Sequence, residues 1–400
     1  MPERRILYVT AVLRAITTSL VGVLIGVYLA RLGMTGAGLG ATISAGLVGA
    51  ALAAVVATFL GDRIGRRRFL ITVTALSVLG TVAFALMASP LGLAAAAFVG
   101  MLNGMGRDRG AALILEQAAL PGTTAPGDRT QVIAWYTMLQ DLGHAVGSLL
   151  AGLPTLLAAT SGTRGASAHR IALYLCAGLG LTAIALYTRL GPAVESSARH
   201  ARLKVAPRSR AILTKISALF AIDSLAGGFL TTAMLSYFFF ERFGVSEAVV
   251  GGLFFGARLM NAASHLGAAW LARRIGLVNT MVFTHIPSSL LLLTVAFAPT
   301  FPIAAILFLL REGLVEMDVP TRQSYVLAVV RPEERTFASG ITNLVRLSAW
   351  AVAPVFAGTL MTGDSMYLPL VIGAGMKIAY DLMLWRAFRG LRPPEELAGA

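Results

Sequence analysis

The chain has 400 residues, of which 56% are hydrophobic and 13% charged, and its mean hydropathy is +0.76. Soluble domains are typically about 45–50% apolar and about 25% charged, so this composition excludes a chain of ordinary soluble domains and indicates an integral membrane protein. The single cysteine excludes a disulfide framework and a cysteine metal site, and the formal net charge of +14 has to be read against membrane topology.

Twelve apolar runs are long enough to cross a membrane as helices, because one crossing needs roughly 20 apolar residues. They lie at residues 6–31, 39–60, 69–88, 91–118, 132–156, 169–190, 213–238, 248–270, 277–297, 301–328, 337–361 and 365–386. A long polar stretch separates the sixth run from the seventh. We therefore expect an all-α membrane protein with an N-terminal six-helix bundle over 1–190, a cytoplasmic linker over 191–212 and a pseudo-symmetric six-helix bundle over 213–400.

The placement of Lys and Arg predicts the orientation of these runs. With the N-terminus in the cytoplasm, 21 of the 33 basic residues fall on cytoplasmic segments, 4 on outside segments and 8 within the runs. Cytoplasmic loops are enriched in Lys and Arg, so both termini are expected to be cytoplasmic. Because the basic residues follow the loops instead of forming one patch, nucleic-acid binding is rejected. The expected location is the plasma membrane, as in a bacterial inner membrane.

The two halves carry an internal repeat. A shift of 211 residues superposes Arg31, Gly33 and Gly40 on Arg242, Gly244 and Gly251, and a shift of 206 lays PGDRT (126–130) over PEERT (332–336). A repeat of six helices keeps its direction across the membrane. Such a parallel repeat predicts a substrate site near the bilayer midplane between the halves, opened alternately to each side.

The turn between the second and third runs reads LGDRIGRRRFL (60–70). It resembles the signature loop of the major facilitator superfamily, Asp-Arg-x-Gly-Arg-Arg/Lys, and the matching residues are Asp62, Arg63, Gly65, Arg66 and Arg67. Twelve expected helices in two related halves extend the resemblance over the chain, although Thr58 replaces the leading glycine of the motif. The resemblance implies that this loop latches the outward-facing state. The alternative is a positively charged anchor without a gating role.

The fifth run contains GHAVGSLLAG (143–152), which is similar to the glycine-rich antiporter motif of that superfamily. Gly143, Gly147 and Gly152 match the motif, whereas Ser148 stands in place of its proline. The resemblance implies an antiporter. Close packing of small residues between membrane helices is the alternative explanation.

Ionisable residues within the runs are costly, about 2.5–3.5 kcal/mol each at a helix centre on insertion scales, so each needs a partner, water or a function. The candidates for proton coupling are Asp223, Asp141, His144, Glu312 and Asp318. The candidates for lining a substrate cavity are Arg14, Arg107, Arg109, Arg311, Asn343, Arg346, Arg258 and Asn261. Arg14 and Asp223 occupy nearly symmetric positions and are candidates to face each other. The competing interpretation, favoured for Arg107, Asp108, Glu312 and Glu316, is a buried ion pair.

These observations predict a secondary active transporter that moves a small solute by alternating access, coupled to protons and acting as an exporter (antiporter). A proton-coupled symporter or a facilitator of an anionic metabolite is the alternative, and a membrane-embedded lipid-handling enzyme or a sensor is less favoured. The sequence contains no GxxxxGK[ST] loop for ATP and no HExxH motif, so no enzyme activity, cofactor or metal is expected. The expected partners are a small-molecule substrate, protons and the lipid bilayer, and the expected state is a monomer.

Overall fold

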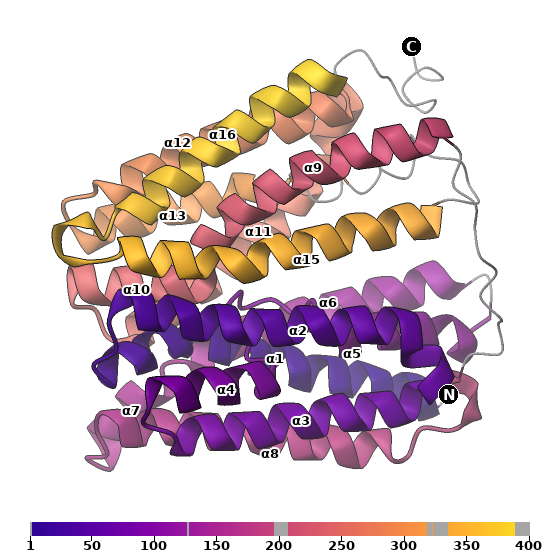
Figure 1. The fold of residues 1–400 in the computed structure, drawn as a ribbon, viewed down its shortest axis with the longest axis horizontal. Coiled ribbons are helices and arrows are strands. Elements are labelled where there is room, and N and C mark those ends of the chain that lie inside the picture. The colour runs from indigo at the N-terminus through magenta and orange to yellow at the C-terminus, as the bar shows by residue number, and fades with distance from the viewer. Residues whose placement is uncertain (1, 126–127, 196–206, 318–321, 323–334, 389–400) are drawn as a thin grey trace. The chain divides into compact units, whose positions relative to one another are not determined.

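The computed structural model describes residues 2–125, 128–195, 207–317, 322 and 335–388. Within these ranges every regular element is a helix and no strand occurs (Figure 1). Nine helices in the described part are long and apolar enough to cross a membrane. The expectation of an all-helical membrane protein is confirmed at this level.

The N-terminal half alternates five helices of 21 residues or more with three short helices and two 3₁₀ turns over its described residues. Its elements are α1 (Pro2–Arg31), α2 (Gly36–Ile64), α3 (Arg66–Leu86), α4 (Pro90–Gly100), α5 (Ala111–Ala119), the 3₁₀ turn η1 (Leu120–Thr123), α6 (Arg129–Leu150), α7 (Leu153–Thr160), α8 (Ala166–Tyr187) and the turn η3 (Pro192–Val194).

The C-terminal half also consists of long and short helices over its described residues. Its elements are α9 (Pro207–Phe229), α10 (Thr232–Phe243), α11 (Glu247–Ile275), α12 (Leu277–Ala296), α13 (Phe301–Val315), α15 (Arg335–Leu360), the turn η5 (Gly363–Ser365) and α16 (Leu368–Phe388).

The chain divides into two compact units. Unit 1 comprises residues 1–199, 231–255 and 354–362, and unit 2 comprises residues 200–230, 256–353 and 363–400. Unit 1 therefore includes α10, the beginning of α11 and the last turns of α15 in addition to the N-terminal half. The two six-helix bundles expected on either side of the linker 191–212 stay a prediction from the sequence.

The fourth apolar run is not one continuous helix. α4 ends at Gly100 and α5 begins at Ala111, and Met101 between them adopts a left-handed conformation with φ of 51°. The Asn103 side chain accepts a hydrogen bond from the Met105 backbone N–H at 2.8 Å and donates one to the Arg107 carbonyl at 2.7 Å. Asparagine side chains that bond nearby backbone offer an alternative to helical bonding, so this segment, called the helix-four break (101–110), leaves the helix.

Two further runs are interrupted. The fifth divides into α6 and α7 at Ala151–Gly152, just before Pro154, whose ring opposes continuation of a helix. The seventh divides into α9 and α10 at Leu230–Thr231 and extends to Phe243, beyond its expected end at 238. The tenth run was expected to extend over 301–328. Its described helix, α13, ends at Val315, and most of the remainder lies outside the described residues.

Candidate functional site: two buried clusters of ionisable residues

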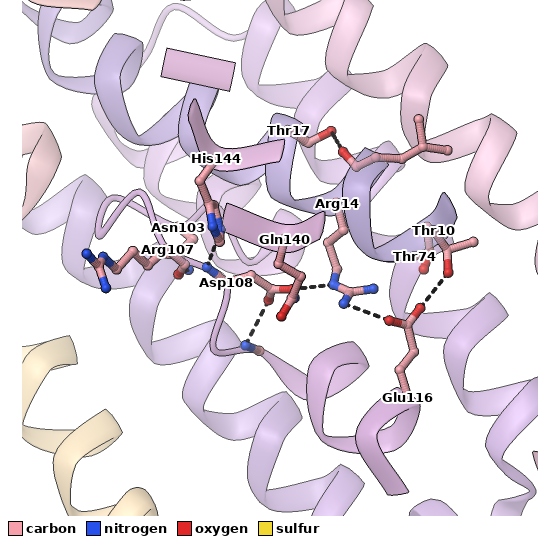
Figure 2. A network of polar contacts seen from close by, with 12 residues as sticks. Thr10, Arg14, Thr17, Thr74, Asn103, Arg107, Asp108, Glu116, Gln140 and His144 are labelled. Atoms are coloured by element: carbon pink, nitrogen blue, oxygen red, sulfur yellow. Dashed lines mark hydrogen bonds and ion pairs between the residues drawn. The ribbon is translucent and has the colours of Figure 1, made fainter. Parts of the chain in front are cut away.

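Arg14, in the middle of α1, is the centre of the buried cluster in unit 1, the Arg14 cluster. Its Nη2 donates to a Glu116 oxygen at 2.8 Å and to the Tyr136 hydroxyl at 3.0 Å. Its Nη1 donates to the Tyr187 hydroxyl at 3.1 Å, and its Nε is bonded to Asp108 (Figure 2). One guanidinium thus joins two carboxylates and two phenols.

Glu116 on α5 is fully buried and accepts four hydrogen bonds. In addition to Arg14, the donors are the hydroxyls of Thr10 at 2.6 Å, Tyr136 at 2.6 Å and Tyr187 at 2.5 Å. A buried carboxylate is tolerated when it is paired and fully hydrogen-bonded. Glu116 therefore links α1, α5, α6 and α8 within unit 1.

Asp108 lies in the helix-four break and contacts α6. Its backbone N–H donates to His144 Nε2 at 3.0 Å (Figure 2), so Nε2 is the acceptor in this bond. Its Oδ2 also lies 3.4 Å from the Gln140 amide nitrogen. His144 is buried, whereas Asp141, three residues earlier on α6, is exposed.

Asp223 on α9 is the centre of the second cluster, the Asp223 cluster, in unit 2. It is only 4% exposed, and its Oδ1 lies 2.9 Å from Lys377 Nζ on α16. Its Oδ2 lies 3.6 Å from Arg322 and 3.7 Å from Arg346. Three cations thus surround one carboxylate among the described residues.

The Asp223 cluster continues through His285 on α12. Lys377 Nζ lies 3.3 Å from His285 Nε2, and His285 Nδ1 lies 3.0 Å from Asp381. Lys377, His285 and Asp381 were not among the sequence candidates, because no sequence spacing relates His285 on α12 to the other two residues on α16. The available signal was a lysine and an aspartate four residues apart within an apolar run.

Aromatic rings flank the guanidinium groups of this cluster. Arg346 lies over the Trp350 ring at 4.7 Å and the Phe220 ring at 5.8 Å, and Arg322 lies over Phe220 at 5.5 Å. Aromatic faces attract guanidinium cations at such distances. The rings therefore orient both arginines without neutralising their charge.

The remaining candidates of unit 2 fall into several environments. The Asn261 side chain donates to the backbone and side-chain oxygens of Glu312 at 2.8 and 2.9 Å, and Arg311 pairs with Glu312. Arg258 is half-buried and Asn343 is exposed, whereas Arg346 one turn later is buried. Asp318 lies outside the described residues. In unit 1, Arg107 and Arg109 are half-buried in the helix-four break.

The loop between α2 and α3 forms a network inside unit 1. Gly65 has a φ of 95°, which favours glycine. Arg66 pairs with Asp62 at 2.7 Å and donates to the Ala118 carbonyl at 2.8 Å. Glu195, which the sequence did not single out, accepts the backbone N–H groups of Arg66 and Arg67 at 2.7 and 3.2 Å. It thereby caps the beginning of α3. Arg63 is exposed.

The glycines of the fifth run lie at close contacts with other helices. A Cβ on Gly143 or Gly147 would collide with the backbone of α1, and one on Gly152 would press on Ala248. Small residues at these positions permit the close packing of α1 against α6.

Glu247, at the beginning of α11, receives contacts from three other helices of unit 1. Its carboxylate lies 3.1 Å from Arg31, 3.0 Å from the Thr155 hydroxyl and 3.5 Å from His169. Burial opposes ionisation of this carboxyl, but hydrogen bonds from His169 and its own backbone N–H, with the charges of His169 and Arg31, lower the pKa of Glu247 to about 2. Glu247 lies outside the apolar runs, and its contact with Arg31 joins the beginning of α11 to the end of α1.

A family model of the major facilitator superfamily matches residues 7–354. The chain belongs to the major facilitator superfamily. Within the described ranges, no group of three or more His, Cys, Asp or Glu side chains is arranged to hold a metal ion.

A relative and several solved structures resemble the chain over nearly its whole length. A membrane protein of Saccharomyces cerevisiae, YJR124C, is 23% identical and is covered to 94%, with 97% of this chain aligned. The nucleoside transporter NupG shares 15% identity with a TM-score of 0.74, covering 97% of this chain and 100% of NupG. The D-xylose-proton symporter shares 13% identity with a TM-score of 0.74, covering 100% of this chain and 99% of the symporter. A bacterial homologue of the human lysosomal transporter Spinster, inward-facing, shares 17% identity with a TM-score of 0.75, covering 98% of this chain and 99% of that chain. These structures agree with this chain in fold.

Proposed function

We propose that this member of the major facilitator superfamily is a secondary active transporter that moves a small solute by alternating access, coupled to protons. The observation that carries the proposal is the Asp223 cluster. A membrane interior does not tolerate ionisable side chains without a partner or a function, and this cluster concentrates two carboxylates, a histidine, a lysine and two arginines within contact distance.

The cluster supports a substrate with an anionic group. In the structure the Asp223 carboxylate occupies the space between Lys377, Arg322 and Arg346. A proton on Asp223 removes its negative charge and leaves these cations able to bind the anion of a substrate, since buried cations favour an opposite charge nearby. Loss of the proton restores the internal pairing and expels the anion. Protonation and substrate binding are coupled in this scheme through one set of contacts.

The remaining coupling candidates take secondary roles in the proposal. His144 holds the helix-four break through its bond to Asp108, and Glu312 is engaged by Asn261 and Arg311. Asp141 is exposed and is a weaker candidate than Asp223, which is only 4% exposed. Export by antiport is supported by the glycine positions of α6. Those glycines serve equally in packing, so symport of an anion is the second candidate.

We also propose twelve membrane crossings, with both termini in the cytoplasm, for a monomer in the plasma membrane. Eleven of the apolar runs coincide with one described helix or with two consecutive ones, such as α4 with α5 or α9 with α10, and the tenth run is described only over α13 and the two residues that follow it. The distribution of Lys and Arg supports this orientation. The α2–α3 loop is the proposed gating element, and its ties to Ala118 and Glu195 would hold it as one body with unit 1.

The test of the proposal is solute flux into proteoliposomes that carry a pH gradient, measured with a panel of radiolabelled small organic anions. The wild-type chain is expected to accumulate a solute in proportion to the gradient. Asp223→Asn is expected to retain exchange without responding to the gradient, and Asp364→Asn, an exposed residue of η5, is the matched control. Wild-type flux that is indifferent to the gradient would refute proton coupling.

A further inference from the structure

An apolar groove runs over the surface of unit 1 where α2, α3 and α4 lie side by side (Figure 1). It has a volume of roughly 430 Å³, and Leu52, Leu76 and Val99 in its wall are 42–54% exposed. The one polar side chain among the residues that line it is Thr72, whose hydroxyl already donates to the Arg68 carbonyl at 3.0 Å. Such a wall fits a hydrocarbon chain and disfavours a polar solute, which would lose its hydrogen bonds there.

A second space, the polar cavity, lies between α1, α3, α8 and the helix-four break. Its volume is roughly 120 Å³, and it is lined by the hydroxyls of Thr17 and Thr18 on α1 and of Thr74, Ser77 and Thr81 on α3. One water-sized group needs about 10–15 Å³ of such volume, so the cavity has room for about eight to twelve of them. It therefore has space for a polar group of several heavy atoms.

The hydroxyls of the polar cavity are able to bond such a group. Those of Thr17, Thr74 and Thr81 donate to backbone carbonyls of their own helices at 2.7–3.0 Å, and each oxygen keeps the capacity to accept a bond. Thr18 and Ser77 add two further hydroxyls, each with one donor and two acceptor sites. A ligand group that itself carries hydroxyls matches this mixture of donors and acceptors.

The charges in the wall of the polar cavity favour an uncharged ligand group. Arg14 and Asp108 are the charged residues that line it, and they are bonded to each other. Arg107, Arg109 and His144 belong to the same part of unit 1 but do not line the cavity. A charged ligand group would need a counter-charge from the wall, whereas hydroxyls need only hydrogen-bond partners.

The groove and the polar cavity meet at Val73 and Met101, because both residues line both spaces. α3 accordingly carries two different faces beside each other. Leu76 lines the groove and Ser77 lines the cavity, and Val73, one turn earlier, stands at the boundary. An apolar space and a hydroxyl-lined space are thus placed next to each other within one unit.

Met101 distinguishes this junction by its backbone conformation as well. Its φ of 51° and ψ of 39° are left-handed, and within the described ranges it is the only residue other than glycine with a positive φ. Residues in such conformations cluster at ligand sites, where the strain is part of the mechanism. The methionine side chain is unbranched and adapts its shape to its surroundings, so it suits a passage between the two spaces.

We propose that the groove and the polar cavity together form a binding site for a single-chain amphiphile with an uncharged, hydroxylated head, such as a fatty-acid monoester of glycerol. The chain lies in the groove, and the head enters the polar cavity past Val73 and Met101. The two volumes together fall within the range of about 300–1,000 Å³ that is typical of small-molecule sites. Surrounding lipid chains are as apolar as the groove, so recognition has to come from the head. The residues of this site are not those of the Asp223 cluster, and the inference does not depend on the proposed function.

The first test uses the wild-type chain in phosphatidylcholine nanodiscs. The probe is a monoacylglycerol with a photoreactive diazirine in its acyl chain, and labelled peptides are identified by mass spectrometry. Labelling is expected to saturate and to fall on the segments of α2, α3 and α4 that line the groove. Excess unlabelled monoacylglycerol is expected to reduce it at least about tenfold, whereas the alkane and the fatty acid of the same chain length are expected to compete weakly.

Each competitor separates one alternative from the proposal. Competition by the alkane as strong as that by the monoacylglycerol would overturn it, because ordinary lipid chains would then occupy the groove without recognition of a head. Equally strong competition by the fatty acid would overturn the preference for an uncharged head. Transport is not measured, so the result stands whether or not solute flux follows a pH gradient.

The second test compares substitutions in the two spaces. Ser77→Leu places an apolar side chain in the polar cavity, and Leu52→Trp narrows the groove, and each is expected to lower labelling at least about tenfold. Leu79→Trp is the matched control and is expected to label like wild type, because Leu79 on α3 is 64% exposed and lines neither space.

A two-part site requires that both substitutions act. Normal labelling of Ser77→Leu beside a loss in Leu52→Trp would overturn the proposal, since the groove alone would then bind the chain. Normal labelling of Leu52→Trp would overturn it equally, since the groove would then not hold the chain. Unfolding midpoints identify a variant that fails to fold, and in that case competition in the wild-type chain decides the question.

Discussion

Replacing Glu116 by leucine removes the acceptor that α1, α6 and α8 share in unit 1. The substitution leaves the hydroxyls of Tyr136 and Tyr187 buried without Glu116 as acceptor, at about 1–3 kcal/mol each, and removes a bond from Arg14 worth about 1.5–3 kcal/mol. Thr10 keeps its bond to the Leu7 carbonyl. These terms sum to about 3.5–9 kcal/mol, and partial relaxation of the coupled network places the expected loss at about 5 kcal/mol.

Glu116→Gln is a milder substitution for comparison. The amide keeps the shape of the side chain and one acceptor oxygen, but it lacks the negative charge that pairs with Arg14. Its expected cost is about 2 kcal/mol. Tyr136→Phe combined with Glu116→Gln completes a double-mutant cycle, for which residues in direct contact are expected to show a coupling of about 0.5–3 kcal/mol. The free energies come from unfolding in mixed micelles with increasing sodium dodecyl sulfate.

Asp364→Asn, an exposed substitution in η5, is the matched control and is expected to stay within about 0.5 kcal/mol of wild type. A loss below about 1 kcal/mol for Glu116→Leu, or a smaller loss for leucine than for glutamine, would show that the four hydrogen bonds do not hold the helices of unit 1 together.

Three further predictions concern backbone geometry, packing and pH. Gly65→Ala, at a φ of 95°, is expected to cost about 1–2 kcal/mol in thermal or detergent unfolding, whereas Gly375→Ala, with open space at its Cβ, is expected to be neutral or slightly stabilising. Gly147→Leu is expected to lower the midpoint of unfolding strongly by separating α1 from α6, and an unchanged midpoint, like that expected for Gly178→Leu, would contradict the close contact. The pKa of Glu247 is lowered from 4.5 to about 2, so its stabilisation is complete above pH 4.5 and is lost as the pH falls towards 2. Unfolding midpoints measured across that interval are expected to fall more for wild type than for Glu247→Gln, and equal slopes would contradict the contribution of this carboxylate.

Local properties of the sequence were sufficient for the fold class. An apolar run of about 20 residues has to satisfy its backbone within a helix when it enters lipid, so the runs predict helices without knowledge of tertiary contacts. The turn at Gly65 and the superfamily loop were equally readable, because a tight turn between two helices depends on a few neighbouring residues. The helix-four break was missed, since its cause is a set of side-chain bonds from Asn103 to nearby backbone that an apolar average does not reveal.

The candidate site was predicted only in part. The sequence singled out Arg14 and Asp223, which are the centres of the two buried clusters, because a charge in the middle of an apolar run is conspicuous. It did not single out Glu116 as a site residue, since this carboxylate stands near a predicted helix end. It favoured Asp141, which the structure places on an exposed side of α6.

Membrane insertion and the family loop followed from the sequence alone, because each depends on residues close together in the chain. The orientation of the loops and the repeat of the halves stay predictions. Tertiary structure alone decided which charges meet. Arg14 pairs with Glu116, 102 residues away, and Asp223 pairs with Lys377, 154 residues away. Such pairings depend on the packing and rotation of whole helices. Helical periodicity places a residue on a face but does not say which helix that face meets.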